Sequence, residues 1–116
     1  MNFSVGVDIV DARRLEKLIN ANRFFLGKIL LPSEKSGGLL SIAGKVAAKE
    51  AILKTLDRGN FSDFMKFEII SEKGNIPVVK FGDLLTKKYG NSRFFLSISH
   101  DKDFSIAIAL RVFLES

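Results

Sequence analysis

The chain has 116 residues, of which 47% are hydrophobic and 27% charged, with a formal net charge of +5. This length supports one hydrophobic core, so we expect a single domain over residues 1–116 whose charge suits a nucleic acid, an anionic lipid, a phosphorylated small molecule or an acidic protein. The absence of cysteine excludes disulfides, thiolate metal sites and a cysteine nucleophile. The sequence has no signal-peptide pattern and no apolar run near the roughly 20 residues that cross a bilayer, so we expect a cytoplasmic protein without a membrane partner.

Hydrophobic periodicity and turn residues predict elements along the whole chain. Asp11 stands where the N-cap of a helix belongs, and Pro32 ends a later helical segment. Strands and helices intermix without repeated βαβ units, so we expect an α+β fold with a mainly antiparallel sheet and packed helices. The expected elements are a strand over residues 3–9, a helix over 12–22, a helical segment over 23–31, a helix over 39–56, strands over 66–71 and 76–81 joined by a turn at 72–75, a short helix over 82–90 and a hairpin within 94–110.

Two of the expected strands have sharply different faces. In the first strand the apolar side chains point one way, as in a half-buried strand, and Gly6 on the other side permits close approach of a backbone or ligand. The last strand carries small residues on one side and large ones on the other, so either helices of the same chain cover both faces or one face packs against another subunit. The small residues are Ser105, Ala107 and Ala109, and the large ones are Phe104, Ile106 and Ile108.

The polar run at residues 99–103 separates the strands of the final hairpin and contains His100, the only histidine in the chain. A histidine at such a turn is either a capping or packing residue or part of a functional site. This stretch alone leaves both interpretations open.

One carboxylate stands out on the longest expected helix. A helical wheel puts Glu50 in the middle of an apolar stripe, between Val46 and Ala43 and close to Leu53. A carboxylate buried there needs a salt bridge to a core lysine or arginine, or else a cation. Asp8 is either a second carboxylate of such a cation site or an ordinary helix-entry residue. Two carboxylates suit Mg²⁺, which keeps several waters and shares its ligand shell with substrate phosphates.

Three lysines share that helix with Glu50. Lys54 lies one turn beyond Glu50, so it is either a phosphate-binding residue or a solvated lysine. Lys45 and Lys49 lie on the flank of the helix, and we interpret Lys49 as an ordinary solvent-exposed residue.

Four segments occur in a fixed order: GVDIV at 6–10, AAKEAILK at 47–54, GNIP at 74–77 and SISHDKDFSIAIA at 97–109. Together they resemble the small 4'-phosphopantetheinyl transferases of the holo-acyl-carrier-protein synthase family, over nearly the whole chain. The resemblance implies this family's α+β fold and a homotrimer with active sites between neighbouring subunits. It also implies Mg²⁺-dependent transfer of 4'-phosphopantetheine from coenzyme A to a serine of an acidic acyl carrier protein, releasing adenosine 3',5'-bisphosphate, as part of fatty acid biosynthesis.

The resemblance assigns roles to individual residues. Asp8 and Glu50 match the metal ligands, and they would be catalytic together with Lys54, which matches the lysine near the transferred phosphate. Glu50, directly or through a metal-bound water, would accept the proton of the serine. In the trimer, Lys45 and His100 would come from one subunit and the metal ligands from its neighbour. The residues expected to bind coenzyme A are Lys45, Lys54, Gly59, Pro77, Ser99 and His100.

The helix expected over residues 12–22 places Arg13, Arg14 and Lys17 close together. These residues form either a plain solvated face or a docking face for an acidic partner. The resemblance favours docking, because Arg14 matches the arginine that meets the carrier protein.

The sequence departs from the family pattern directly after the longest helix. Asp57 and Arg58 stand there, where small residues are usual. An aspartate at this place would repel a phosphate, and Arg58 would offset that repulsion.

A small nucleic-acid-binding module is the alternative function, because the chain is basic and has 11 phenylalanines. However, the phenylalanines lie mostly in apolar runs, as core residues do, and no aromatic recognition motif is present. A catalytically inactive homologue is a third interpretation, which the presence of Asp8, Glu50 and Lys54 disfavours. We therefore expect an enzyme without a nucleic-acid partner.

Overall fold

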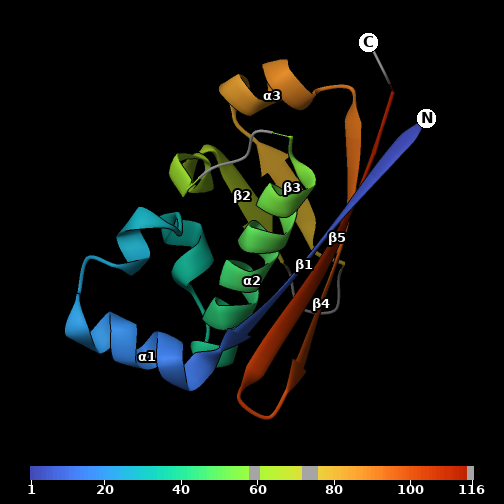
Figure 1. Cartoon of the computed structure of the whole chain (residues 1–116). Coiled ribbons are helices and arrows are strands. Elements are labelled where there is room, and N and C mark those ends of the chain that lie inside the picture. The colour runs from blue at the N-terminus through green and yellow to red at the C-terminus, as the bar shows by residue number, and fades with distance from the viewer. Residues whose placement is uncertain (58–60, 72–75, 115–116) are drawn as a thin grey trace.

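The computed structural model describes residues 1–57, 61–71 and 76–114 (Figure 1). The predicted α+β order is confirmed, while the turn predicted at 72–75 lies outside the described residues. In these ranges, no helix has the length and hydropathy to cross a bilayer. The elements are β1 (Asn2–Asp11), α1 (Ala12–Ala21), η1 (Leu26–Lys28), η2 (Pro32–Lys35), α2 (Leu39–Thr55), η3 (Phe61–Lys66), β2 (Phe67–Ile70), β3 (Val78–Phe81), α3 (Asp83–Tyr89), β4 (Ser92–Asp101) and β5 (Phe104–Phe113).

Strand β5 lies at the centre of a three-stranded antiparallel sheet, between β1 and β4. The predicted hairpin of β4 and β5 closes through Lys102 and Asp103, and Lys102 has a φ of 55°, the left-handed conformation found in tight hairpin turns. Strands β2 and β3 form a separate antiparallel pair. The ring of Phe81 in β3 packs edge-on against Phe94 in β4 with centroids 4.9 Å apart, so the two sheets share one core.

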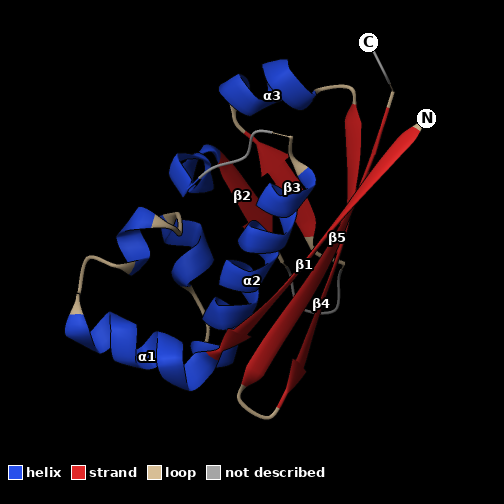
Figure 2. Cartoon of the chain, in the orientation of Figure 1, coloured by secondary structure: helices blue, strands red, loops and turns tan. Residues whose placement is uncertain are grey.

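Helix α2 packs against one face of the three-stranded sheet (Figure 2). The parts of β1 and β5 on this face carry mostly small residues. Ala107 and Ala109 of β5 are fully buried there. A Cβ at Gly6 of β1 would lie 2.0 Å from the carbonyl oxygen of Ala51 in α2. The close backbone approach predicted for Gly6 is therefore confirmed, because any side chain at this position would push the strand off the helix.

The opposite face of the sheet is exposed, which corrects the prediction for the first strand. The apolar side of β1 points away from α2, because only the side that carries Gly6 lets strand and helix come close. One of the two alternatives for the last strand was that helices of the same chain cover both of its faces. Within the described residues, this alternative is wrong. We call this surface the outer apolar face; it consists of Phe3, Val5, Val7, Ile9, Phe95, Phe104 and Ile108, whose exposed fractions are 41–63%.

The continuous helical segment predicted over residues 23–31 is wrong. The short 3-10 turn η1 stands there instead, and a second 3-10 turn, η2, follows it. Pro32 begins η2 rather than ending a helix, because its missing N–H is not needed in the first turn. Ile29 and Leu30 lie between the turns and are buried in the core. The chain bends here to insert both side chains, which one straight helix would place on different sides.

The interpretation of Lys49 as solvent-exposed is also wrong. Its side chain is fully buried, and its Nζ lies 2.5 Å from Oε1 of Glu34 in η2. The same ammonium donates to the carbonyl oxygens of Ile29 and Phe64, at 3.3 and 2.6 Å. Burial lowers the pKa of Lys49, and the Glu34 carboxylate opposes that shift. Helix α2 has no solvated flank at this level, and Lys45 one turn earlier is buried as well.

Candidate active site

The polar side of β1 brings Asp8 to the last turns of α2. Lys54 reaches across from the helix, and its Nζ lies 3.2 Å from Oδ1 of Asp8 and 2.8 Å from the carbonyl oxygen of Val7. Gly6, two residues earlier on the same side of the strand, creates this proximity by letting β1 lie directly on α2. Asp8 and Lys54, 46 positions apart in the sequence, therefore form one polar cluster.

Glu50 lies one helical turn before Lys54 and is half-buried. Burial raises the pKa of Glu50, the nearby Asp8 carboxylate raises it further, and the Lys54 ammonium opposes both effects. Among the described residues, Glu50 makes no salt bridge with a lysine or arginine, so the structural ion pair considered from the sequence is not formed there. Glu50 and Asp8 are thus like charges held close to each other.

A divalent cation fits these two carboxylates. Both side chains offer the hard oxygen ligands that Mg²⁺ prefers, and a cation would relieve the repulsion that raises the pKa of Glu50. The part of the chain that the structure describes has no cluster of three or more metal-binding side chains. A cation held by Asp8 and Glu50 would take its other ligands from water and from a phosphate, an arrangement common for Mg²⁺.

His100 lies at the other end of α2, on β4. Its Nδ1 is 2.7 Å from the hydroxyl oxygen of Ser105, which in turn donates to the carbonyl oxygen of Leu40 at 3.0 Å. The ring packs against Gly44, where an added Cβ would lie 3.0 Å from Cε1. His100 is nevertheless solvent-exposed, as is the neighbouring Ser99. One nitrogen of the ring is anchored in the protein, and the side chain as a whole remains accessible.

The carboxylates and His100 do not meet in one chain. His100 in β4 stands opposite Ser105, and Asp8 in β1 stands opposite Ala107. The two residues therefore belong to strands on opposite sides of β5, which lies between them. A single chain therefore presents two separate polar groups, which only an extended ligand or a second subunit would connect.

The basic residues of α1 have different surroundings. The guanidinium of Arg13 lies 2.8 Å from the Asp103 carboxylate in the hairpin turn, whereas Arg14 and Lys17 are exposed. Arg14 lines a groove of about 440 Å³ that is mostly apolar. The other lining residues are Ile9, Val10, Asp11, Leu15, Leu18, Phe25, Val46 and Phe104.

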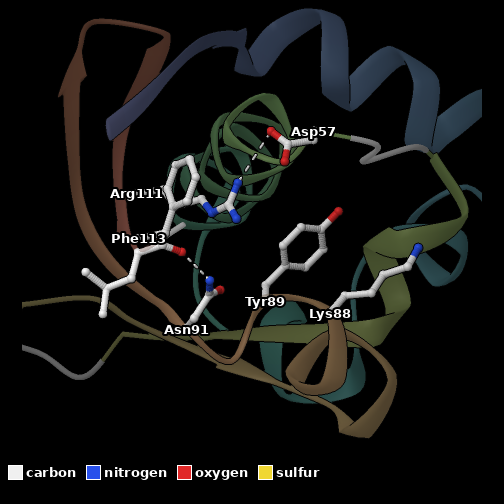
Figure 3. A pocket seen from close by; sticks show the side chains of 7 residues that line it. Asp57, Lys88, Tyr89, Asn91, Arg111 and Phe113 are labelled. Carbon is white, nitrogen blue, oxygen red and sulfur yellow. Dashed lines mark hydrogen bonds and ion pairs between the residues drawn. The ribbon is translucent and has the colours of Figure 1, made fainter. Parts of the chain in front are cut away.

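A second hollow, of about 340 Å³, lies beyond the end of α2 (Figure 3). Its central cation is Arg111 of β5, a buried residue that donates to the Ser92 hydroxyl at 2.8 Å and to the Thr55 carbonyl at 3.3 Å. The guanidinium stacks on the ring of Phe113, with its carbon 3.8 Å from the ring centroid. Arg111 thus ties the last turn of α2 to β4 and β5. The lining residues are Asp57, Lys88, Tyr89, Asn91, Arg111, Phe113 and Leu114.

Sequence reasoning missed Arg111, although the alternation of the last strand places it on the same side as Ser105, Ala107 and Ala109. The sequence led us to expect that Arg58 would offset the negative charge of Asp57, but a different arginine lies beside that carboxylate. The Asp57 carboxylate lies 3.6 Å from the Arg111 guanidinium, which offsets its charge. Arg58 lies outside the described residues.

Gly59 and Pro77 are the other two residues that the resemblance assigns to coenzyme A binding. Gly59 lies outside the described residues, and so do Gly74 and Asn75 of the GNIP turn. Pro77 is half-buried and directly precedes β3.

Comparisons with known proteins identify the family to which this fold belongs. A family model described as the 4'-phosphopantetheinyl transferase superfamily matches residues 4–109. The holo-[acyl-carrier-protein] synthase of Clostridium kluyveri is 38% identical over 120 residues, which cover 95% of this chain and 90% of that protein. The corresponding protein of Campylobacter jejuni (strain 81116) is 38% identical over 109 residues, covering 90% of this chain and 95% of that protein.

Solved structures agree with the family match. The crystal structure of Helicobacter pylori holo-[acyl-carrier-protein] synthase in complex with coenzyme A has a TM-score of 0.83 and 31% identity, covering 94% of this chain and 100% of that one. The crystal structure of the Neisseria meningitidis protein of the same name has a TM-score of 0.81 and 29% identity, covering 93% and 96%. The resemblance drawn from the four sequence segments is thereby confirmed.

Proposed function

Because the chain belongs to the 4'-phosphopantetheinyl transferase superfamily, we propose that it transfers the 4'-phosphopantetheine group of coenzyme A to a serine of an apo-acyl carrier protein. The observation that carries this proposal is the cluster of Asp8, Glu50 and Lys54, in which two carboxylates and an ammonium meet at one surface. Such a cluster suits phosphoryl transfer, where a protein mainly positions groups and stabilises charge.

The reaction forms one bond and breaks one. The serine oxygen attacks the phosphorus that carries the pantetheine arm, and the bond from that phosphorus to the bridging oxygen breaks, so adenosine 3',5'-bisphosphate leaves. Glu50, which lies beside Asp8 and Lys54, accepts the serine proton. Lys54 holds Asp8 in place and stabilises the negative phosphoryl oxygens. No covalent enzyme intermediate is needed.

Asp8 and Glu50 would hold Mg²⁺, for which both side chains have the right oxygen donors. When bound, the ion supplies charge neutralisation on the pyrophosphate of coenzyme A. The raised pKa of Glu50 supports this assignment, because burial and then the nearby Asp8 carboxylate disfavour its charged form, and a bound cation would favour it.

We place the coenzyme A site between subunits of a homotrimer. The outer apolar face supports this arrangement, since a monomer rarely leaves such a contiguous apolar patch in water. The placement of Asp8 and His100 on strands at opposite sides of β5 supports it as well. In this trimer Lys45 and His100 come from one subunit and the metal ligands from its neighbour, with Gly59, Pro77 and Ser99 completing the cleft.

The acyl carrier protein docks at the groove beside α1. Arg14 stands at this groove with Leu15 and Leu18, so an acidic protein would find both a charge and apolar contacts there. Lys17 adds positive charge, while Arg13 is already paired with Asp103.

One assay tests the function directly. Purified protein is incubated with apo-acyl carrier protein, Mg²⁺ and coenzyme A labelled in its pantetheine arm, and the label is expected on the carrier protein. A variant of the carrier protein that lacks the acceptor serine is the control. No transfer under these conditions contradicts the proposal. A melting temperature raised by single-stranded RNA and unchanged by coenzyme A with Mg²⁺ would instead favour the nucleic-acid-binding alternative.

A further inference from the structure

His100, the only histidine of the chain, shares a hydrogen bond with the buried hydroxyl of Ser105. Ser105 of β5 is fully buried, and its hydroxyl stands between two partners. Nδ1 of His100 is 2.7 Å away, and the carbonyl oxygen of Leu40 in the first turn of α2 is 3.0 Å away. The three groups form a short chain from the helix backbone to the imidazole.

Counting protons fixes the direction of this chain. A hydroxyl has one proton to donate, and a carbonyl oxygen only accepts. If the proton pointed to Nδ1, the oxygens of Ser105 and Leu40 would face each other at 3.0 Å without a proton between them. Burial of Ser105 keeps water from relieving that contact. The proton therefore goes to Leu40, and Nδ1 of His100 must itself donate to Ser105.

We propose that Ser105 is a positioning residue that fixes His100 in the tautomer with hydrogen on Nδ1 and thereby prepares Nε2 for contact with coenzyme A. In this tautomer the free lone pair of the neutral ring lies on Nε2. The ring takes up a proton there without disturbing the buried bonds, and it then donates to a phosphate oxygen. Gly44 supports the same orientation, because it leaves room for the ring against α2.

This inference rests on the proposed function where it assigns His100 to coenzyme A binding, but its tautomer claim does not. In water the tautomer with hydrogen on Nε2 is the more populated one. The protein therefore has to hold the opposite tautomer, and Ser105 is the residue that makes the required hydrogen bond.

Nitrogen-15 NMR of the imidazole tests the claim, and the single histidine gives one set of signals without assignment. At a pH where the ring is neutral, the wild-type protein is expected to show hydrogen on Nδ1. Ser105→Ala is expected to shift the ring toward hydrogen on Nε2. Its KM for coenzyme A should rise about fivefold, the usual worth of one hydrogen bond, with kcat within about twofold. Ser97→Ala, which changes an exposed serine on the same hairpin, is the matched control and should keep the wild-type tautomer.

A wild-type ring with hydrogen on Nε2 overturns the proposal without any variant, so the test does not depend on the folding of Ser105→Ala. A Ser105→Ala ring that keeps hydrogen on Nδ1 also overturns it. A changed tautomer with unchanged affinity for coenzyme A overturns the positioning role. Wild-type protein that binds no coenzyme A contradicts the proposed function and this role together, whereas the NMR result still reports separately whether Ser105 fixes the ring.

Discussion

Gly6 of β1 lies directly on the carbonyl oxygen of Ala51 in α2, so closely that a Cβ at Gly6 would stand 2.0 Å from that oxygen. This contact sets the distance between the strand that carries Asp8 and the helix that carries Glu50 and Lys54. The packing of the core and the geometry of the candidate active site therefore depend on the same residue.

Gly6→Ala should lower the free energy of unfolding by about 1–3 kcal/mol or more, because the strand must move off the helix. Transfer activity should fall at the same time, since Asp8 moves away from Lys54. Urea denaturation and the transfer assay measure the two effects. Gly27→Ala is the control, because a Cβ there would lie 3.6 Å from the Lys35 ammonium, an ordinary contact. A Gly6→Ala protein as stable as the control would contradict this account.

Glu50→Gln should reduce transfer by a factor of about 10² to 10⁴, the usual contribution of a catalytic base. Without divalent cations the variant should melt at a higher temperature than the wild type. The pKa of Glu50 is raised in the folded protein, so the folded state binds the proton more tightly than the unfolded chain, and a neutral side chain is favoured there.

Mg²⁺ should raise the melting temperature of the wild type and not that of Glu50→Gln. Glu16→Gln, on the exposed side of α1, serves as the control and should respond to Mg²⁺ like the wild type. A Glu50→Gln protein that keeps its transfer activity would show that Glu50 is an incidental carboxylate.

Lys49→Met should lower the free energy of unfolding by about 3–5 kcal/mol, because it leaves the buried carboxylate of Glu34 without its cation. Glu34 also accepts hydrogen bonds from the backbone N–H groups of Leu31 and Ile69, so it cannot turn away toward water. Denaturant unfolding measures the loss, with Lys35→Met as an exposed control. A loss below about 1 kcal/mol would mean that the pair contributes little beyond its packing.

Arg14→Glu should raise the KM for the carrier protein about tenfold and leave the KM for coenzyme A within about twofold, because the charge reversal repels only the acidic partner. The effect should shrink at high salt. Lys87→Glu on α3, at the opposite end of the molecule from α1 (Figure 1), is the control for a general change in charge. If neither Arg14→Glu nor high salt alters the KM for the carrier protein, the groove beside α1 is not the docking site.

Asp8→Ala and His100→Ala proteins should each be weak alone and regain activity when they are unfolded and refolded together. In an equal mixture of trimers with sites between subunits, about a quarter of all interfaces carry neither lesion, so about a quarter of the wild-type activity is expected. Each variant refolded alone is the control. Sedimentation of the wild type as a monomer, or a mixture no more active than its parts, would place the site within one chain.

The sequence by itself determined the order of the elements and most of their limits. Helix α1 and the final hairpin are periodic, and Asp11 caps α1 as predicted by accepting the backbone N–H of Arg13. These signals are local, because periodicity and capping depend on neighbours within a few residues. The segments around Asp8, Glu50 and His100 carried the family resemblance for a similar reason, since each lies in one short stretch of chain.

Only the tertiary structure decided which side of a strand is buried. Alternation shows that the faces of β1 differ, but the close contact of Gly6 with Ala51 turns the small-residue side inward and leaves the apolar side exposed. Burial of Lys49 likewise depends on Glu34, a partner 15 residues away. The environment of His100 depends on Ser105 and on the backbone of α2. Such pairings arise when separate elements pack together, and an isolated stretch of sequence has no property that reports which distant group will meet it.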